Sequence, residues 1–177
     1  MGYLLAAARD SGYEVHGLEL SPWAAAQARD VLHLEVTVGG VESVEFPRSS
    51  FDIIVMWHVI EHFVDPLANL RRLRMWLRPG GVLILETRNF MGFDARRLGA
   101  AWNGWSLPHH LWHFSPRSLR RMLKEADFRH VVTRTDHSGL VKQRLRNIPV
   151  LSALRNVISF WIPGSNVRAI GWVEGVS

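Results

Sequence analysis

Two uninterrupted apolar runs most strongly constrain the fold of this chain. Residues 51–57 (FDIIVMW) and 82–87 (VLILET) are dominated by Val, Ile and Leu, with almost no alternation of polar and apolar side chains. Such runs are typical of strands buried on both faces of a parallel sheet. The amphipathic segment between them, residues 66–77, is long enough for a helix. The pattern therefore predicts strands that alternate with helices in an α/β fold.

Three helix starts are marked by a capping side chain followed by proline. Ser21-Pro22, Asp65-Pro66 and Ser115-Pro116 each place an N-cap residue before a proline at the first helical position. Helices are therefore expected over residues 22–33, 66–77 and 116–126, and a short one over 2–11 that ends at Gly12. Strands are expected over residues 13–18, 34–38, 51–57, 82–87, 131–135 and 170–176.

Composition narrows the class of protein. The 177 residues suit one domain, residues 1–177, and the absence of cysteine excludes disulfides, zinc–thiolate sites and a cysteine nucleophile. Residues 1–86 carry 7 basic and 11 acidic side chains, whereas residues 87–177 carry 14 basic and 5 acidic ones. The basic half would suit phosphate-bearing or anionic-lipid partners, or it is simply a solvated surface. The start MGYLLAAARD lacks the pattern of a signal peptide, so we expect a cytoplasmic protein.

One carboxylate, Glu19, stands where an apolar strand is expected to end and a helix to begin. Ligands of open α/β sheets bind beyond the carboxyl ends of the strands, and an acidic residue about 20 positions after a glycine turn accepts hydrogen bonds from ribose hydroxyls. Gly2 precedes Glu19 by 17 positions. The alternatives are a solvent-facing loop glutamate or a charge partner of the helix N-terminus.

Several segments together resemble class I S-adenosylmethionine-dependent methyltransferases. They are SFDIIVMWHVIEHFVDP with LRPGGVLILET, then GYLLAAARDSGYEVHGLELSPWAAAQAR, and PHHLWHFSPRSLRRMLKEADF. The likeness covers roughly residues 2–135 and is to the small-molecule and glycan-modifying subgroup called type 11, 12 or 23. It implies a Rossmann-like, mostly parallel twisted sheet with helices on both faces and an antiparallel last strand. The family's first strand and most of its glycine motif have no counterpart, so we expect an N-terminally truncated chain.

The resemblance also implies a binding site for S-adenosyl-L-methionine. Glu19 and Leu20 would hold the ribose, and Gly2 would end the glycine turn under the methionine moiety. The loop Gly40-Val41-Glu42 would surround the adenine, although Gly40 stands where the family often has an acidic residue. Past the strand over 51–57, the donor sulfonium or the acceptor would be faced by Met56, Trp57 and His58.

Histidines supply the candidates for a general base, which would help methyl transfer if the acceptor is a hydroxyl. We expect catalysis from His62, His109 or His110, with His58 and His113 as further candidates. His58, Glu61 and His62 would share one face of a helical turn, a pattern at which a quinone-ring subgroup of the family carries a metal. Two histidines and one carboxylate are unspecific, so no metal is expected. The tryptophans that would stack on an acceptor or pack a lid are Trp102, Trp105 and Trp112.

The C-terminal part is expected to contain a helical insertion, residues 136–169, before the last strand. Residues 150–162 form an apolar helical face, which would pack on the sheet or in a dimer, or contact a membrane peripherally through residues 140–162. We therefore expect methyl transfer to an oxygen or nitrogen of a small-molecule, glycan or lipid-linked acceptor, and no nucleic acid partner. The alternatives are a non-catalytic binding module and an NAD-dependent oxidoreductase.

Overall fold

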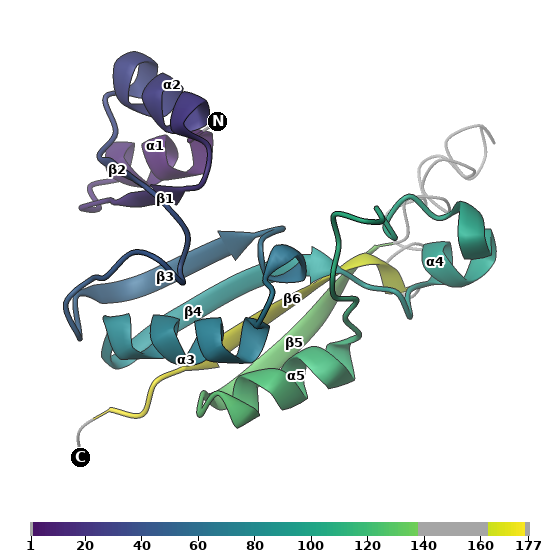
Figure 1. Cartoon of the computed structure of the whole chain (residues 1–177). Helices are drawn as coiled ribbons and strands as arrows, with labels where there is room; N and C mark the ends of the chain where they lie inside the picture. Colours follow the sequence, from purple (N-terminus) through teal and green to yellow (C-terminus); the bar gives the residue numbers. More distant parts are fainter. Residues whose placement is uncertain (1, 138–162, 176–177) are drawn as a thin grey trace, which may run out of the picture. The chain divides into compact units, whose positions relative to one another are not determined.

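The computed structural model describes residues 2–137 and 163–175, and the chain forms two compact units, Met1–Phe46 and Pro47–Ser177 (Figure 1). The first unit consists of α1 (Tyr3–Asp10), β1 (Gly17–Glu19), α2 (Pro22–Leu32) and β2 (Val36–Val38). The two strands pair in parallel, with Glu19 opposite Val38. Its small core is built from Ala6, Ala25, Ala28, Leu34 and Val36.

The second unit is built on a four-stranded sheet in the order β3-β4-β6-β5. Its elements are β3 (Phe51–Trp57), η1 (Ile60–His62), α3 (Pro66–Trp76), β4 (Leu77–Arg88), α4 (Phe93–Leu98), η2 (Gly99–Ala101), α5 (Pro116–Glu125), β5 (Arg129–His137) and β6 (Pro163–Trp172). The β3–β4 pair is parallel, and β6 is antiparallel to both β4 and β5. The α/β class and the antiparallel last strand are thus confirmed.

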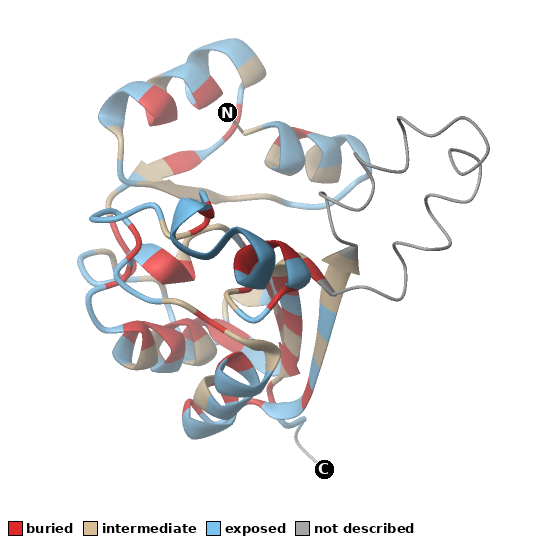
Figure 2. Ribbon diagram, turned by 90° about the vertical axis from the view of Figure 1, so that its right-hand side faces the viewer, coloured by how far each residue is buried: buried red, intermediate tan, exposed pale blue. Residues whose placement is uncertain are grey.

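Helices α3 and α5 lie side by side on one face of this sheet (Figure 1). Each turns a buried stripe inward and an exposed stripe outward (Figure 2). The three predicted caps are present, since the side chains of Ser21, Asp65 and Ser115 accept hydrogen bonds from the backbone N–H three residues later. These helices begin where the sequence predicted.

The second half of β4, which contains the strand expected over residues 82–87, begins after an irregularity in the strand pairing. Phe51 pairs with Leu77 but Ile53 pairs with Val82, so residues 78–81 bulge out opposite the single residue Asp52. Gly80 allows this path because its φ is 78°, in the left-handed region. Arg78 then reaches back to the Asp52 carboxylate at 2.6 Å. The strand therefore starts at Leu77 instead of residue 82.

The predicted helical insertion over residues 136–169 is wrong at both ends. Residues 136–137 end β5, and residues 163–169 form the first part of β6. Residues 138–162, with the predicted apolar helix over 150–162, lie outside the described residues. Within the described part of the chain, no helix has both the length and the apolar character to cross a bilayer.

Candidate active site

In the first unit, Glu19 ends β1 and lies beside the loop that follows β2. Its Oε1 accepts a hydrogen bond from the Ser21 backbone N–H at 2.9 Å, and its carbonyl accepts one from the Gly39 N–H at 2.9 Å. Its other carboxylate oxygen makes no hydrogen bond with the residues that the structure describes. The half-buried carboxylate is thus fixed at the carboxyl end of the strand with one oxygen free to accept hydroxyl donors, as a ribose requires.

The loop predicted to surround an adenine closes on itself after β2. Gly40 and Val41 are buried, and the backbone N–H groups of Ser43 and Val44 both donate to the Gly40 carbonyl, at 3.1 and 3.0 Å. A Cβ on Gly40 would lie 2.5 Å from the Glu42 carboxylate, so Glu42 folds back over this glycine. The residues present therefore suit the predicted cofactor, with Glu19 and this loop together at the strand ends.

Gly2 and Leu20 complete the predicted cofactor residues of the first unit. Gly2 caps α1 with φ 81°, a left-handed conformation that favours glycine, and a Cβ there would lie 2.9 Å from the end of the Leu34 side chain. Leu20 is 68% exposed. The ligand contacts of both residues remain predictions.

In the second unit, the end of β3 presents Trp57 and His58. Met56 is buried, whereas Trp57 is exposed and lies under the guanidinium of Arg168, 5.3 Å from its ring centroid. His58 takes a left-handed conformation, φ 53°, and its backbone N–H donates to the Glu86 carbonyl at 2.9 Å. This conformation places the imidazole among buried carboxylates.

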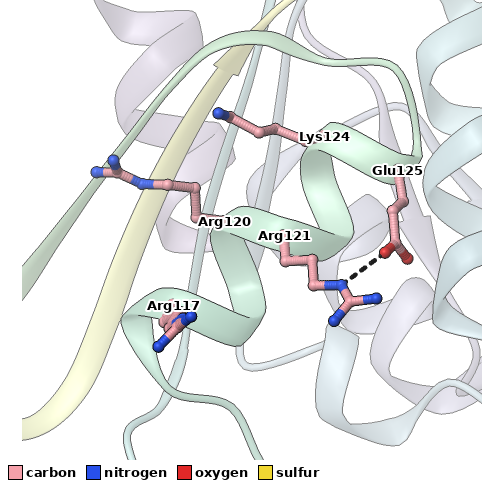
Figure 3. Close-up of a pocket in the computed structure, with 5 residues that line it drawn as sticks. All are labelled: Arg117, Arg120, Arg121, Lys124 and Glu125. Carbon is pink, nitrogen blue, oxygen red and sulfur yellow. Dashed lines mark hydrogen bonds and ion pairs between the residues drawn. The ribbon is translucent and has the colours of Figure 1, made fainter.

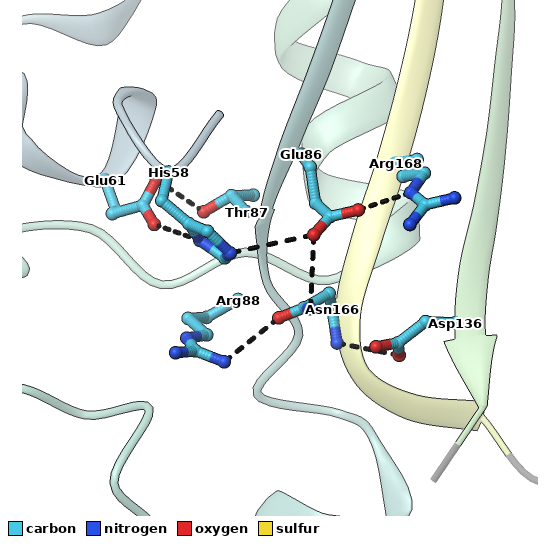
Figure 4. A network of polar contacts seen from close by, with 8 residues as sticks. All are labelled: His58, Glu61, Glu86, Thr87, Arg88, Asp136, Asn166 and Arg168. Carbon is cyan, nitrogen blue, oxygen red and sulfur yellow. Dashed lines mark hydrogen bonds and ion pairs between the residues drawn. The ribbon is translucent and has the colours of Figure 1, made fainter. Parts of the chain in front are cut away.

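The His58 ring is held by Glu61, which is itself anchored by Thr87 (Figure 4). His58 Nδ1 lies 3.0 Å from Glu61 Oε1, and the Thr87 hydroxyl donates to Glu61 Oε2 at 2.8 Å. Burial acts to raise the pKa of the Glu61 carboxyl, but the hydrogen bonds from His58, its own backbone and Thr87 hold the pKa below its usual range. An ionised Glu61 accepts only, so Nδ1 carries a hydrogen, and in a neutral ring Nε2 is the acceptor.

A second buried carboxylate, Glu86, lies on the Nε2 side of the ring. The distance from His58 Nε2 to Glu86 Oε1 is 3.6 Å. Glu86 accepts hydrogen bonds from Asn166 Nδ2 at 3.2 Å and from the guanidinium of Arg168 (Figure 4). A proton taken up by His58 would therefore lie between two carboxylates, which stabilise the resulting positive charge.

Asp136 extends this network to β5. Its Oδ1 accepts a hydrogen bond from the Asn166 backbone N–H at 3.0 Å, and Arg88 donates to Asn166 Oδ1 at 3.2 Å. Burial raises the pKa of the Asp136 carboxyl, and the nearby carboxylates of Glu86 and Asp94 raise it further. The carboxyl groups at this end of the sheet thus outnumber its arginines, which are Arg88 and Arg168.

His62 and His110 form a second histidine group on the other side of Glu61. His62 Nδ1 donates to the His109 carbonyl and His110 Nδ1 to the Gly104 carbonyl, both at 2.9 Å, and the two rings meet edge to face at 4.9 Å. His109 is exposed and contributes only its backbone. One ligand atom from each of Glu61, His62 and His110 lies within 4.8 Å of the others, so these three side chains could hold a divalent cation.

The tryptophans of the segment before α5 divide into packing and exposed residues. Trp102 is buried, and Trp105 stacks edge to face on Trp102 and on His113, at 5.2 and 4.9 Å. Trp112 is 42% exposed. Of the three, Trp112 alone has a large free surface.

Sequence reasoning missed Glu86, Asp136, Asn166 and Arg168. Glu86 is a carboxylate inside an apolar run, a signal that could have marked it. Its partners come from β6, which the sequence analysis placed mostly in a helix. The pairing of Glu86 with Arg168 across β4 and β6 brings them together.

Comparison with known proteins identifies the family. Residues 1–133 match a family described as a methyltransferase domain. The ubiquinone biosynthesis O-methyltransferase of Xanthomonas campestris pv. campestris (strain B100) is 30% identical over 168 residues, which span 88% of this chain and 69% of that protein.

Solved structures agree in fold. A chain in the complex of the Haloferax volcanii Trm112 methyltransferase activator with a methyltransferase matches 98% of this chain and 78% of its own length, with a TM-score of 0.73 at 18% identity. The SAM-dependent methyltransferase of Archaeoglobus fulgidus matches 97% of this chain and 81% of its own, with a TM-score of 0.66 at 15% identity. The chain belongs to the methyltransferase domain family and has the Rossmann-like fold of the S-adenosylmethionine-dependent methyltransferases.

Proposed function

We propose that the protein transfers a methyl group from S-adenosylmethionine to a hydroxyl oxygen of a small-molecule acceptor, with His58 as the general base. The observation that carries the proposal is the chain of contacts from Thr87 through Glu61 to His58 Nδ1. The name of the Xanthomonas relative, an O-methyltransferase of ubiquinone biosynthesis, supports an oxygen acceptor. An amine acceptor would need less help from a base, and the histidine arrangement would then have no evident use.

The bound donor supplies a methyl group on a sulfonium, which is transferred by in-line displacement. In the first unit, Glu19 would accept hydrogen bonds from the ribose hydroxyls of the donor, and Gly40 to Glu42 would enclose its adenine. At the end of β3, His58 Nε2 takes the proton of the acceptor hydroxyl as the oxygen attacks. Glu61 holds the ring in the correct tautomer and, with Glu86, stabilises the imidazolium that forms.

His58→Asn tests the base directly. Asparagine tolerates the left-handed backbone at this position, so the substitution removes the imidazole without straining the fold. We expect kcat to fall about 100-fold to 1000-fold, the usual contribution of general-base catalysis. Affinity for S-adenosylhomocysteine, measured by calorimetry, is expected to stay within about twofold because His58 is not placed on the ribose or the adenine.

A matched control is His130→Asn, which changes an exposed histidine with φ 48°. Activity would be followed as S-adenosylhomocysteine release with a panel of hydroxylated aromatic compounds. If His58→Asn retained its kcat while His62→Asn or His110→Asn lost it, the general base would be assigned to His62 or His110. Binding of NAD instead of S-adenosylhomocysteine would contradict the proposal altogether, and binding of neither would favour a non-catalytic module.

Chelation with EDTA distinguishes two ways of activating the acceptor. One is proton transfer to His58, and the other is a divalent cation bound by Glu61, His62 and His110. Proton transfer to His58 requires no Lewis acid, so we expect methyl transfer to survive EDTA. Activity lost in EDTA and restored by a divalent cation would assign the activation of the acceptor to that cluster instead.

A further inference from the structure

Helices α3 and α5 form a strongly basic layer on one face of the sheet. Together they carry seven cationic side chains and a single acidic one, Glu125. The cations are Arg71, Arg72 and Arg74 on α3, and Arg117, Arg120, Arg121 and Lys124 on α5. The catalytic proposal makes no use of this charge, because the predicted site residues lie at the strand ends and in the first unit.

The cations of α5 form one continuous stripe. Their positions, i, i+3, i+4 and i+7, lie on a single helical face, and all four are exposed (Figure 3). The opposite face, with Leu119 and Leu123, is fully buried. The helix is therefore held by its apolar side, and the whole basic side faces solvent.

Part of the charge of the two helices is neutralised within the protein, and on α3 Arg74 pairs with Asp127 at 3.0 Å. Arg121 pairs with Glu125 at 2.8 Å, and Arg120 donates to the Thr133 hydroxyl at 3.2 Å. Arg117 and Lys124 form no ion pair with the described residues. The pocket that these side chains line contains one carboxylate against four cations, which suits a polyanionic partner.

Exposed apolar side chains in the segment that leads into α5 favour a lipid surface over a nucleic acid. Leu107, Leu111 and Trp112 are 72%, 54% and 42% exposed, and Trp112 lies three residues before the N-cap Ser115. These apolar and aromatic side chains precede the basic helix in sequence, and such side chains combined with cations are typical of segments that lie on a bilayer, where the cations meet anionic headgroups. The phosphodiester backbone of a nucleic acid would pair with the cations, but it would leave the exposed apolar side chains without a partner.

We propose that the outward face of the α3–α5 layer docks on an anionic membrane surface. Each arginine or lysine near such a surface contributes about fivefold to the partition coefficient at moderate ionic strength. Removal of three of them is therefore expected to weaken binding about 100-fold. The attraction falls off within a Debye length, so it must weaken with salt.

The test is flotation of the full chain with phosphatidylcholine vesicles that contain or lack phosphatidylglycerol, at low and high salt. We expect binding only to the anionic vesicles and only at low salt. The variant Arg117→Gln/Arg120→Gln/Lys124→Gln should lose that binding. The matched control Arg48→Gln/Arg96→Gln/Arg97→Gln removes the same charge from exposed positions outside the two helices and should keep it. Circular dichroism and calorimetry with S-adenosylhomocysteine verify that both variants are folded.

Three results would overturn the proposal. One is equal flotation of the α5 variant and the wild type. Another is loss of flotation in the control variant, which would place the contact elsewhere. The third is binding of a double-stranded oligonucleotide, abolished in the α5 variant, by a protein that does not float with vesicles.

Discussion

At the scale of single residues, the end of the sheet concentrates more negative charge than its cations balance. Glu61 and Glu86 are each satisfied by two partners, His58 with Thr87 for the first and Asn166 with Arg168 for the second. Asp136 accepts a hydrogen bond from a backbone N–H, but it forms no ion pair with a side chain of the described residues. This difference explains why the pKa of Glu61 is lowered and the pKa of Asp136 is raised.

Asp136→Asn is expected to stabilise the protein at neutral pH. The pKa of Asp136 is raised above 3.8, so its contribution to stability is full below that value and is lost as the pH rises through the folded-state pKa. Asparagine keeps the oxygen that accepts the Asn166 N–H and removes the charge. We expect the melting temperature to rise by about 1–3 °C at pH 7 and to be unchanged near pH 3.

Asp30→Asn is the control for this measurement, since Asp30 is exposed on α2 and far in sequence from the acidic group. It should leave the melting temperature unchanged at both pH values. If Asp136→Asn melted below the wild type at pH 7, the repulsion of the Asp136 carboxylate by Glu86 and Asp94 would not destabilise the protein as proposed.

The sequence predicted only part of the candidate active site. Some of its residues are close in sequence, whereas others are brought together only by strand pairing. His58 and Glu61 are close in sequence, so their spacing was enough to pair them. The predicted single helical face with His62 is wrong, because His58 has a left-handed backbone outside η1 and His62 packs on His110 instead. Glu86, Asn166 and Arg168 meet only through the register of β4 against β6, which sequence spacing does not reveal. Glu19 and the loop after β2 could be predicted because both follow parallel strands.

At the scale of elements, α4 is fastened to the ends of β4 and β6. The Asn89 backbone N–H donates to the Ser165 carbonyl at 2.7 Å, and its side chain donates to the Gly164 carbonyl at 3.2 Å. The Ser165 hydroxyl donates to Asp94 on α4 at 2.6 Å. This clamp fixes the start of β6 and, with it, the strand that carries Asn166 and Arg168.

Gly92→Ala is expected to loosen the clamp. Gly92 has an ordinary φ of −66°, but a Cβ there would lie 2.1 Å from the Gly164 carbonyl oxygen, and backbone atoms cannot move aside cheaply. We expect a loss of about 1–3 kcal/mol in the free energy of unfolding, measured in urea. Gly175→Ala, where a Cβ would meet nothing within 4 Å, should be nearly neutral. Equal stabilities of the two variants would show that the strand and α4 separate easily.

Elements with a local signal were predictable, and elements that depend on partners were not. The capped helices begin at the predicted residue because the N-cap side chain and the following proline determine where a helix can start. Strand β6 begins at Pro163, seven residues before the expected start, since its first part gains its hydrogen bonds from β4 and β5. Helix α4 has six residues and no capping side chain, so nothing in the sequence marked it.

At the scale of the whole molecule, the two units differ greatly in the size of the side chains that form their cores. The core of the first unit holds three alanines, one leucine and one valine. That of the second includes large side chains with almost no exposure, among them Ile60, Leu70, Leu83, Phe114 and Phe128. Burial stabilises in proportion to apolar area, and small units bury a smaller fraction of their surface on folding than large ones. The first unit should therefore depend more strongly on what it binds.

Hydrogen exchange followed by mass spectrometry tests this dependence. Without ligand, we expect peptides that contain β1 and β2 to exchange faster than those that contain β4 and β6, because the smaller core opens at a lower free energy. S-adenosylhomocysteine at about 100 times its Kd should slow exchange in β1, β2 and the Gly40 loop, since a ligand that binds only the folded form adds about 2.7 kcal/mol of stability. Glu19→Ala should abolish this protection, whereas Glu14→Ala, an exposed residue outside the strands, should leave it intact. If the ligand slowed exchange only in the second unit, Glu19 could not belong to the cofactor site.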